Sequence, residues 1–406
     1  MGIEQQAAAL RRGIIRITPD NGLEAKLRRA SDEGRPLIVK LGLDPTAPDI
    51  HLGSAVVLRK LRQFQDLGHQ VVVIIGDFTA MIGDPSGKSE TRKQLSEQEI
   101  RSNAQTYADQ YCRILDPDRT QVRFNSEWLG KLDFADVIRL AARMTVAQVM
   151  ERDDFANRWR AGHPIGLHEL LYPLCQAYDS VVLKADIEMG GSDQMFNILA
   201  GRDLQAHYGQ EPQVAVFTPL LVGLDGVQKM SKSLGNYVGI TEPPDSMFGK
   251  LMSISDQMME TYFELTTDVP LEEVRALMEG ISSGSVNPKD VKRRLAREVV
   301  TIYHGEAAAH EADAEFERVH ARHQMPESMP EVAIPAETAR EGRIWICKLL
   351  VLAGMAKGTG EARRLVEQGA VWLGENRCTS ADTDVELAAL SGTVIRVGNR
   401  RFARLR

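Results

Sequence analysis

The stretch that decides the fold runs from residue 36 to residue 78 and reads PLIVKLGLDPTAPDIHLGSAVVLRKLRQFQDLGHQVVVIIGDF. It begins with a short apolar strand, PLIVKLGL, and ends with QVVVIIGDF, a continuous apolar run typical of a strand buried in a parallel sheet. Between these two strands, the apolar residues of about 52–67 recur at helical spacing. The stretch therefore predicts a strand–helix–strand unit.

The same alternation continues over residues 36–235. PQVAVFTPLLVG (212–223) is another buried strand, and helices are expected near 97–115, 133–150 and 167–180. This pattern predicts an α/β fold, a Rossmann-like open parallel sheet with helices on both faces. Ligands of such sheets bind at the carboxyl ends of the strands, so the loops that follow the strands are the expected site.

The rest of the chain divides by composition. We expect a catalytic domain over 1–240, a helical domain over 241–324 and a linker over 325–342 that contains Pro326, Pro330 and Pro335. Residues 343–406 are predicted to form a small α+β domain of two short helices followed by strand-like segments.

Composition excludes several classes of protein. The 406 residues carry a net charge of −7, and hydrophobic residues make up 43% of them. No apolar run approaches the roughly 20 residues of a membrane span, and the N-terminus lacks a signal-peptide core, so a cytoplasmic protein without membrane contact is expected. The segment 343–406 carries 11 Lys and Arg against 6 Asp and Glu, which predicts a local surface that binds a polyanion.

The first chemical motif lies where the predicted helix of 52–67 begins. His51 and Gly53 stand at its start, and a helix N-terminus offers free N–H groups and partial positive charge to a phosphate. Gly53 lets a nucleotide approach the backbone closely. His51 and Thr46, in the preceding loop, could both donate hydrogen bonds to phosphate oxygens. A capping or surface histidine is the alternative reading.

GDPSGKS (83–89) has the composition of a P-loop but not its spacing. Gly83 and Gly87 are separated by three residues, where the phosphate-binding motif needs four. We interpret the segment as a tight loop after a strand that brings Asp84 and Lys88 to a site, with a plain turn as the alternative.

Polar side chains also share one face of the predicted helix in HELLYPLCQAYDSVVL (168–183). Tyr172, Gln176 and Asp179 recur at i, i+4 and i+7, which suits a small zwitterion, although a solvated helix face would look the same. GGSDQ (190–194) follows at a predicted strand-to-helix turn, where paired glycines precede Asp193 and Gln194.

The most specific motif is GVQKMSKSLGN (226–236), a polar loop directly after a predicted buried strand. Its two lysines, Lys229 and Lys232, suit a triphosphate whose charge moves during nucleotidyl transfer.

Taken together, HxG at a helix start, GGSDQ and KMSKS, in this order on a parallel sheet, resemble the class I aminoacyl-tRNA synthetases. With GLDPTAPDIHLG, GDPSGKS and YPLCQAYD the chain looks like the bacterial tyrosyl-tRNA synthetases over its whole length, and LLVLAGMAKGTGEARRLVEQGAVWLGE (349–375) resembles the S4 RNA-binding fold. The resemblance implies activation of L-tyrosine by ATP, with Mg²⁺, followed by transfer to tRNA(Tyr). It also implies a homodimer with one tRNA spanning both subunits.

The resemblance assigns expected roles by position. Thr46 and His51 contact the triphosphate, Lys229 and Lys232 stabilise pyrophosphate, Lys88 and Arg92 are further mobile cations, and Gly53, Ser54, Asp193 and Ser231 belong to the ATP subsite. Asp84, Tyr172 and Gln176 hold the ammonium group of tyrosine, Asp179 accepts from its phenol, and Lys40, Asp44 and Gln194 complete the tyrosine subsite. Arg363 and Arg364 are expected to contact tRNA phosphates, with ordinary surface charge as the alternative.

Two residues depart from the family pattern. The first motif usually closes with a second histidine, where this chain has Ser54, so we expect adenylate formation to be reduced but not lost. Lys40 stands where many members carry a tyrosine that bonds the substrate hydroxyl. Selection against phenylalanine is therefore expected to depend on Asp179.

Three alternatives remain open at this point. The chain could be an inactive RNA-binding descendant of a synthetase, with Ser54 as the mark of a lost site. It could be a nucleotidyltransferase for small molecules, although the helical region and the basic C-terminal end would then have no purpose. It could also be a synthetase for another amino acid, of which tryptophan is the nearest.

Overall fold

The structure is a computed structural model that describes residues 2–44, 50–86, 99, 103, 110–321, 329–339, 342–398 and 401–406. It divides into two compact units, Met1–Tyr303 and His304–Arg406, each of which is described by itself. Within the described residues, no helix is both long and apolar enough to cross a membrane. The four-part domain division made from the sequence stays a prediction.

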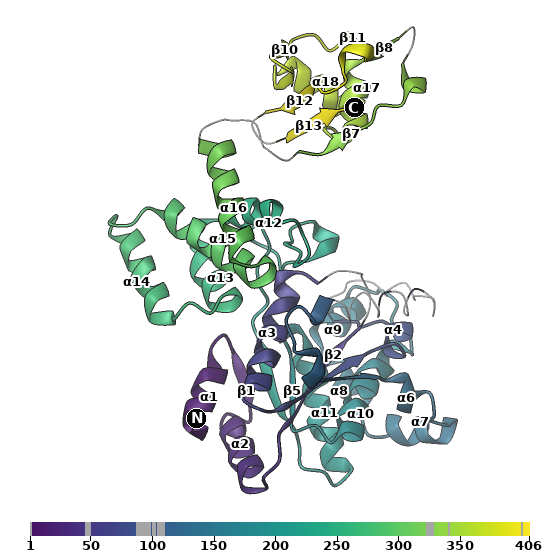
Figure 1. Cartoon of the computed structure of the whole chain (residues 1–406). Coiled ribbons are helices and arrows are strands. Elements are labelled where there is room, and N and C mark those ends of the chain that lie inside the picture. The colour runs from purple at the N-terminus through teal and green to yellow at the C-terminus, as the bar shows by residue number, and fades with distance from the viewer. Residues whose placement is uncertain are drawn as a thin grey trace. The chain divides into compact units, whose positions relative to one another are not determined.

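The first unit is built on a six-stranded sheet in the order β1-β6-β5-β2-β3-β4 (Figure 1). Its strands are β1 (Arg16–Thr18), β2 (Ile38–Leu43), β3 (Gln70–Ile75), β4 (Thr120–Phe124), β5 (Ile187–Gly191) and β6 (Val214–Thr218). Strands β2 to β6 pair in parallel, as the uninterrupted apolar runs predicted. The Rossmann-like α/β fold is therefore confirmed.

One edge of the sheet differs from the prediction. Strand β1 pairs antiparallel with β6, so the sheet is mixed and not wholly parallel. The segment Arg16–Thr18 is three residues long, too short to show the periodicity from which strands are recognised. Its pairing therefore depends on the neighbouring strand and not on its own sequence.

Helices connect and cover the strands of this unit. They are α1 (Ile3–Arg11), α2 (Gly22–Asp32), α3 (Leu52–Asp66), α4 (Thr79–Ile82), α6 (Ser126–Leu129), α7 (Phe134–Ala141), α8 (Val146–Val149), α9 (Asp153–Arg160), α10 (Tyr172–Leu183) and α11 (Met195–His207). Helices α10 and α11 lie side by side and bury an apolar cluster between them and α7 (Figure 1). The helix expected over 133–150 is two helices, because Thr145 caps α8 with its side chain and opens a new helix there.

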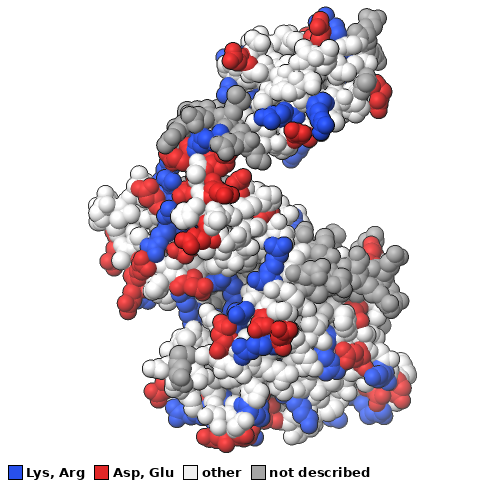
Figure 2. Space-filling model, viewed as in Figure 1, with Lys and Arg blue, Asp and Glu red and all other residues white. Residues whose placement is uncertain are grey.

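No strand follows β6 over the described residues 244–316, as the sequence predicted, because these residues form helices joined by short connections. These helices are α12 (Pro244–Met252), α13 (Met259–Thr266), α14 (Leu271–Ser282) and α15 (Pro288–His304) in the first unit and α16 (Glu306–Phe316) in the second. Acidic side chains gather along α16 on the face shown in Figure 2.

The C-terminal part of the second unit packs two helices on small sheets. Helices α17 (Ile346–Leu352) and α18 (Thr359–Glu367) accompany the strands β7 (Glu331–Val332), β8 (Arg343–Trp345), β9 (Val371–Leu373), β10 (Asn376–Cys378), β11 (Asp384–Glu386), β12 (Val394–Val397) and β13 (Arg401–Leu405). Five strands form one sheet in the order β10-β9-β12-β13-β7, and β11 pairs with β8. Their apolar residues form a separate core with those of α17 and α18, so this small α+β fold has a core of its own.

Candidate active site

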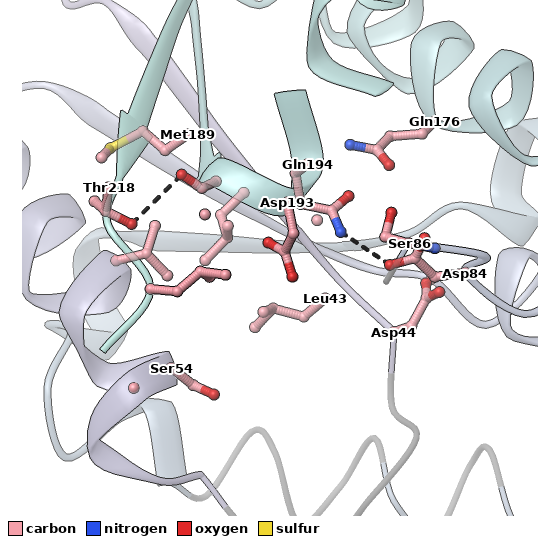
Figure 3. Close-up of a pocket in the computed structure, with 18 of the residues that line it drawn as sticks. Leu43, Asp44, Ser54, Asp84, Ser86, Gln176, Met189, Asp193, Gln194 and Thr218 are labelled. Atoms are coloured by element: carbon pink, nitrogen blue, oxygen red, sulfur yellow. Dashed lines mark hydrogen bonds between the residues drawn. The ribbon is translucent and has the colours of Figure 1, made fainter. Parts of the chain in front are cut away.

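A cavity of about 600 Å³ opens at the carboxyl ends of the parallel strands of the first unit. The ends of β2, β3, β5 and β6 all contribute to its lining, together with the start of α3, one face of α10 and the loop after β6 (Figure 3). Most of the described residues predicted for the site line it: Asp44, His51, Gly53, Ser54, Asp84, Tyr172, Gln176, Asp179, Asp193, Gln194, Lys229, Ser231 and Lys232. Segments far apart in the chain thus meet at the edge that open parallel sheets use for ligands.

His51 is the N-cap of α3. Its backbone is extended, and its Nδ1 accepts a hydrogen bond of 3.3 Å from the backbone N–H of Ser54. A Cβ at Gly53 would lie 3.0 Å from the same Nδ1, so the glycine leaves the space that the imidazole occupies. Because Nδ1 is the acceptor, the ring proton of a neutral His51 sits on Nε2 and is available as a donor.

The surroundings of His51 keep its imidazole neutral. Burial, followed by the ammonium groups of Lys232 and Lys229, lowers the pKa of His51 to about 4. At neutral pH the residue is therefore an uncharged hydrogen-bond donor, and the positive charge of this end of the cavity resides on the two lysines.

The loop that carries these lysines is held by hydrogen bonds to the side chain of Asn236. Asn236 accepts from the backbone N–H of Ser231 at 2.8 Å and donates to the backbone oxygen of Lys229 at 3.2 Å and to Asp225 at 2.6 Å. Lys229 also forms an ion pair of 2.8 Å with Asp193, across the mouth of the cavity. Both lysines are thus placed by a turn of fixed shape and not by a buried core.

On the α10 side, Tyr172 and Asp44 form a polar pair. The Tyr172 hydroxyl donates to one oxygen of Asp44 at 2.8 Å, and the hydroxyl of Thr79 donates to the other at 2.8 Å. A Cβ at Gly76 would lie 2.1 Å from Asp44, so this aspartate fits closely against the backbone after β3. Asp44 is therefore held by neighbours from three segments of the chain.

Asp84 is fixed in a ring of hydrogen bonds that the sequence did not reveal. It accepts from Gln194 Nε2 at 2.9 Å (Figure 3), while Asn197 donates to the Gln194 oxygen at 3.0 Å. The buried Arg152 donates to Asn197 at 2.6 Å and to the hydroxyl of Ser86 at 3.0 Å. The backbone N–H of Ser86 completes the ring by donating to Asp84 at 2.9 Å.

Asp179 lies at the deepest part of the polar face of α10. Its side chain accepts from Trp128 Nε1 at 2.8 Å, and the residue is 3% exposed. Burial raises the pKa of Asp179 to about 7, against the opposing effects of the charge of Lys40 and of the hydrogen bond from Trp128. A ligand hydroxyl in the cavity could donate a second hydrogen bond to the carboxylate of Asp179.

The structure places Lys40 differently from the sequence prediction. Lys40 is fully buried, it is not among the residues that line the cavity, and its ammonium group lies 3.1 Å from the carboxylate of Glu188. It therefore lies outside the lining of the cavity, and its expected place in the tyrosine subsite stays a prediction. The sequence did not predict three further residues near the cavity, Glu188, Trp128 and Arg152. Each is recognised only from its burial against a predicted site residue.

Three further predictions lie outside the described residues. They concern Thr46, Lys88 and Arg92, each expected near the triphosphate.

In the C-terminal unit, Arg363 and Arg364 lie exposed on α18, and Arg363 forms an ion pair of 3.1 Å with Asp382. The sequence missed a second basic surface on the five-stranded sheet. Trp372 on β9 is the cross-strand partner of Arg377 on β10 and of Arg396 on β12. The guanidinium groups of both arginines lie over its indole ring. Basic side chains are visible over this unit in Figure 2.

Residues 32–321 match the family described as tRNA synthetases class I (W and Y). The tyrosine–tRNA ligase of Moorella thermoacetica is 58% identical over 403 residues, which cover 99% of this chain and 96% of that protein. Those of Carboxydothermus hydrogenoformans and Geobacter sulfurreducens are 52% and 51% identical over 99% and 100% of this chain, and over 98% and 99% of their own lengths.

Solved structures share the fold at lower identity. The tyrosyl-tRNA synthetase of Archaeoglobus fulgidus in complex with L-tyrosine superposes with a TM-score of 0.62 at 22% identity, over 77% of this chain and all of that one. The truncated mitochondrial tyrosyl-tRNA synthetase of Aspergillus nidulans gives a TM-score of 0.62 at 21% identity, over 78% of this chain and 94% of that one.

Proposed function

The chain belongs to the class I tRNA synthetases of the tryptophan and tyrosine group, and from this premise we propose how its cavity joins L-tyrosine to tRNA(Tyr). It is a tyrosine–tRNA ligase that uses ATP. The observation that supports the residue assignments is one shared cavity: His51 and the lysines line it from one side, and the polar face of α10 lines it from another.

In the first step, the carboxylate oxygen of L-tyrosine attacks the α-phosphorus of ATP, and the bond to the bridging oxygen breaks, so that tyrosyl-adenylate forms and pyrophosphate leaves. The reaction needs alignment and charge stabilisation but no protein nucleophile. His51 Nε2–H and the N–H groups of the first turn of α3 donate to phosphate oxygens. Lys229 and Lys232 neutralise the charge that develops on pyrophosphate, and for Lys229 this means leaving Asp193.

Tyrosine lies along α10 in this proposal. Asp84, Gln176 and the Tyr172–Asp44 pair offer oxygen atoms to its ammonium group, and Asp179 accepts from its phenolic hydroxyl. In the second step, a ribose hydroxyl at the 3′ end of tRNA attacks the carbonyl carbon of the adenylate, and AMP leaves. Asp193 and Gln194 line the junction at which the two substrates meet.

Mg²⁺ is proposed to enter with ATP. Within the described residues, no group of three or more His, Cys, Asp and Glu side chains is arranged to hold a metal ion. Mg²⁺ typically takes few protein ligands and completes its shell with phosphate oxygens and water. We also propose that the enzyme works in the cytoplasm, where its tRNA substrate is used.

ATP–pyrophosphate exchange with each of the twenty amino acids tests the activation step. Exchange driven by tyrosine alone is expected. Exchange driven by tryptophan would contradict the assignment of the amino acid, and absence of exchange from folded protein that binds tRNA would favour an inactive RNA-binding descendant.

Restoring histidine at position 54 is expected to raise the rate of adenylate formation. Ser54 lines the cavity on α3 across from Gln176 (Figure 3), and its hydroxyl is shorter than an imidazole. One additional donor to phosphate contributes about 1–3 kcal/mol, so Ser54→His should accelerate activation by about fivefold or more. Stopped-flow measurement of adenylate formation checks this, and an unchanged rate would show that Ser54 costs nothing.

We propose that the chain acts as a homodimer. Support comes from exposed apolar side chains concentrated in one segment of the first unit: Phe134 (80% exposed), Ile138, Val146, Trp159 and Leu167 (83%). Large exposed apolar residues mark an interface when they lie together on one surface, and we propose that these residues do. Phe134→Asp is expected to convert a dimer to a monomer in sedimentation equilibrium, whereas Ile15→Asp, at another exposed apolar residue, should not.

We further propose that residues 343–406 form an S4-like domain that binds tRNA, supported by the 11 Lys and Arg against 6 Asp and Glu in this segment. Arg363→Ala with Arg364→Ala is expected to weaken tRNA binding about tenfold at low salt and to reduce the salt dependence by about two charges. Tyrosine-dependent pyrophosphate exchange should not change. If the double variant binds tRNA as tightly as the wild type at every salt concentration, these arginines are ordinary surface charges.

A further inference from the structure

A buried ion pair lies beneath the tyrosine side of the cavity. Lys40 on β2 and Glu188 on β5 are register partners on adjacent parallel strands, their charged atoms are 3.1 Å apart, and both side chains are 1% exposed. The desolvation of two such charges often outweighs their attraction, so a buried pair is weak evidence of a stabilising role. The pair contacts Gln176, one of the residues that line the cavity, which suggests a role in ligand binding.

Glu188 holds the side chain of Gln176. One carboxylate oxygen accepts from Gln176 Nε2 at 3.1 Å, and the other accepts from the Ser180 hydroxyl at 3.1 Å and from the side-chain amide of Gln213. An ionised carboxylate accepts hydrogen bonds and cannot donate them. The NH₂ group of Gln176 therefore turns toward Glu188, which leaves its carbonyl oxygen for the cavity that Gln176 lines.

Lys40 connects this carboxylate to the rest of the subsite. Its ammonium group donates to the backbone oxygen of Gln176 at 3.3 Å, and its charge also acts on Asp179. The space around Glu188 is closed, since a Cβ at Gly201 would lie 2.7 Å from Gln213 and 3.2 Å from Glu188. Neither charge can thus move away to water without repacking the floor of the cavity.

We propose that the Lys40–Glu188 pair is a positioning element for recognition of the amino group of tyrosine. Glu188 fixes the Gln176 amide with its oxygen toward the ammonium group, and Lys40 balances the negative charge of Glu188 beside Asp179. A fixed acceptor favours an ammonium group and disfavours a ligand without one. The inference deepens the proposed function, because it assumes that tyrosine occupies this face of α10.

Glu188→Gln tests the proposal, because an amide at position 188 can donate as well as accept and so releases the orientation of Gln176. Calorimetry would compare the Kd of L-tyrosine with that of 3-(4-hydroxyphenyl)propionate, which has the phenol and carboxylate but no amino group. The wild-type preference for L-tyrosine is expected to fall about tenfold or more, which is the typical effect of one misplaced buried hydrogen bond. A conserved preference in folded Glu188→Gln would overturn the proposal.

Glu169→Gln is the matched control, because Glu169 pairs with Arg158 at 2.6 Å, both side chains are 2% exposed, and neither residue lines this cavity. It should lower Tm without changing the preference. If Glu188→Gln fails to fold, Lys40→Met with Glu188→Gln removes both charges together. Loss of preference is still expected there, whereas a wild-type preference would show that Glu188 does not orient Gln176. Because binding is measured directly, absence of pyrophosphate exchange from the wild type would count against the proposed function and not against this role.

Discussion

Lys232→Ala is expected to lower kcat for tyrosine-dependent pyrophosphate exchange by about 100- to 1000-fold, the usual effect of removing one group that stabilises transition-state charge. Lys232 faces the same end of the cavity as His51, and its charge reaches the imidazole strongly enough to lower the pKa of His51. In the proposed mechanism its ammonium group contacts the pyrophosphate only as charge develops there. The KM for tyrosine should therefore stay within about twofold, because a loss confined to the transition state leaves ground-state binding unchanged.

The matched control for this experiment is Lys292→Ala. Lys292 is a lysine of the same unit that pairs with Asp256 at 2.6 Å, but it lies on α15 and does not line the cavity. Exchange by Lys292→Ala should equal that of the wild type. A rise in the KM for tyrosine that accounts for the whole loss in Lys232→Ala would show that this lysine binds the ground state and would contradict the assigned role.

Asp179→Ala is expected to reduce the preference for tyrosine over phenylalanine, measured as the ratio of kcat/KM values, by about 100-fold or more. A site built to bond a hydroxyl rejects the analogue without it, because the buried group of the protein is then left without its partner. Tyrosyl-tRNA synthetases are themselves the standard example of such rejection, at about 10⁵-fold, so that figure is a reference for the family and not a value derived from this structure. An unchanged ratio would show that another group reads the hydroxyl.

The pH dependence offers a second measurement on the same residue. Because the pKa of Asp179 is raised to about 7, its carboxyl is largely neutral at pH 6 and largely ionised at pH 8. The ionised form is the stronger acceptor, so kcat/KM for tyrosine should rise with pH through about 7, and kcat/KM for phenylalanine should not follow. Asp179→Asn should remove the rise while it keeps an acceptor oxygen in place. His51 should add no step in this window, since its pKa is lowered to about 4.

The sequence was a sufficient guide to the parts of this protein that are local in the chain. An apolar run such as QVVVIIGDF predicts a strand that is buried on both faces of the sheet. The two lysines of KMSKS lie within five consecutive residues, so the motif is recognised from the sequence alone. The helix start at His51 and the polar face of α10 are equally local, because helical spacing alone aligns Tyr172, Gln176 and Asp179. For these features the sequence predicted the element and the side chains that line the cavity.

The tertiary structure decided what depends on strands meeting across the fold. Strand β1 forms by pairing with the edge of the sheet at β6. Lys40 lies beside Glu188 because the register of β2 and β5 makes them partners. The sequence alone predicts that Lys40 belongs to the tyrosine subsite, but nothing local in the chain reveals that this lysine is buried and paired with Glu188. Periodicity and motifs report on neighbours along the chain, whereas desolvation and charge pairing are properties of neighbours in space. The sequence therefore determined the fold class and most of the residues that line the cavity, and tertiary packing decided which charges line it and which are buried and paired outside its lining.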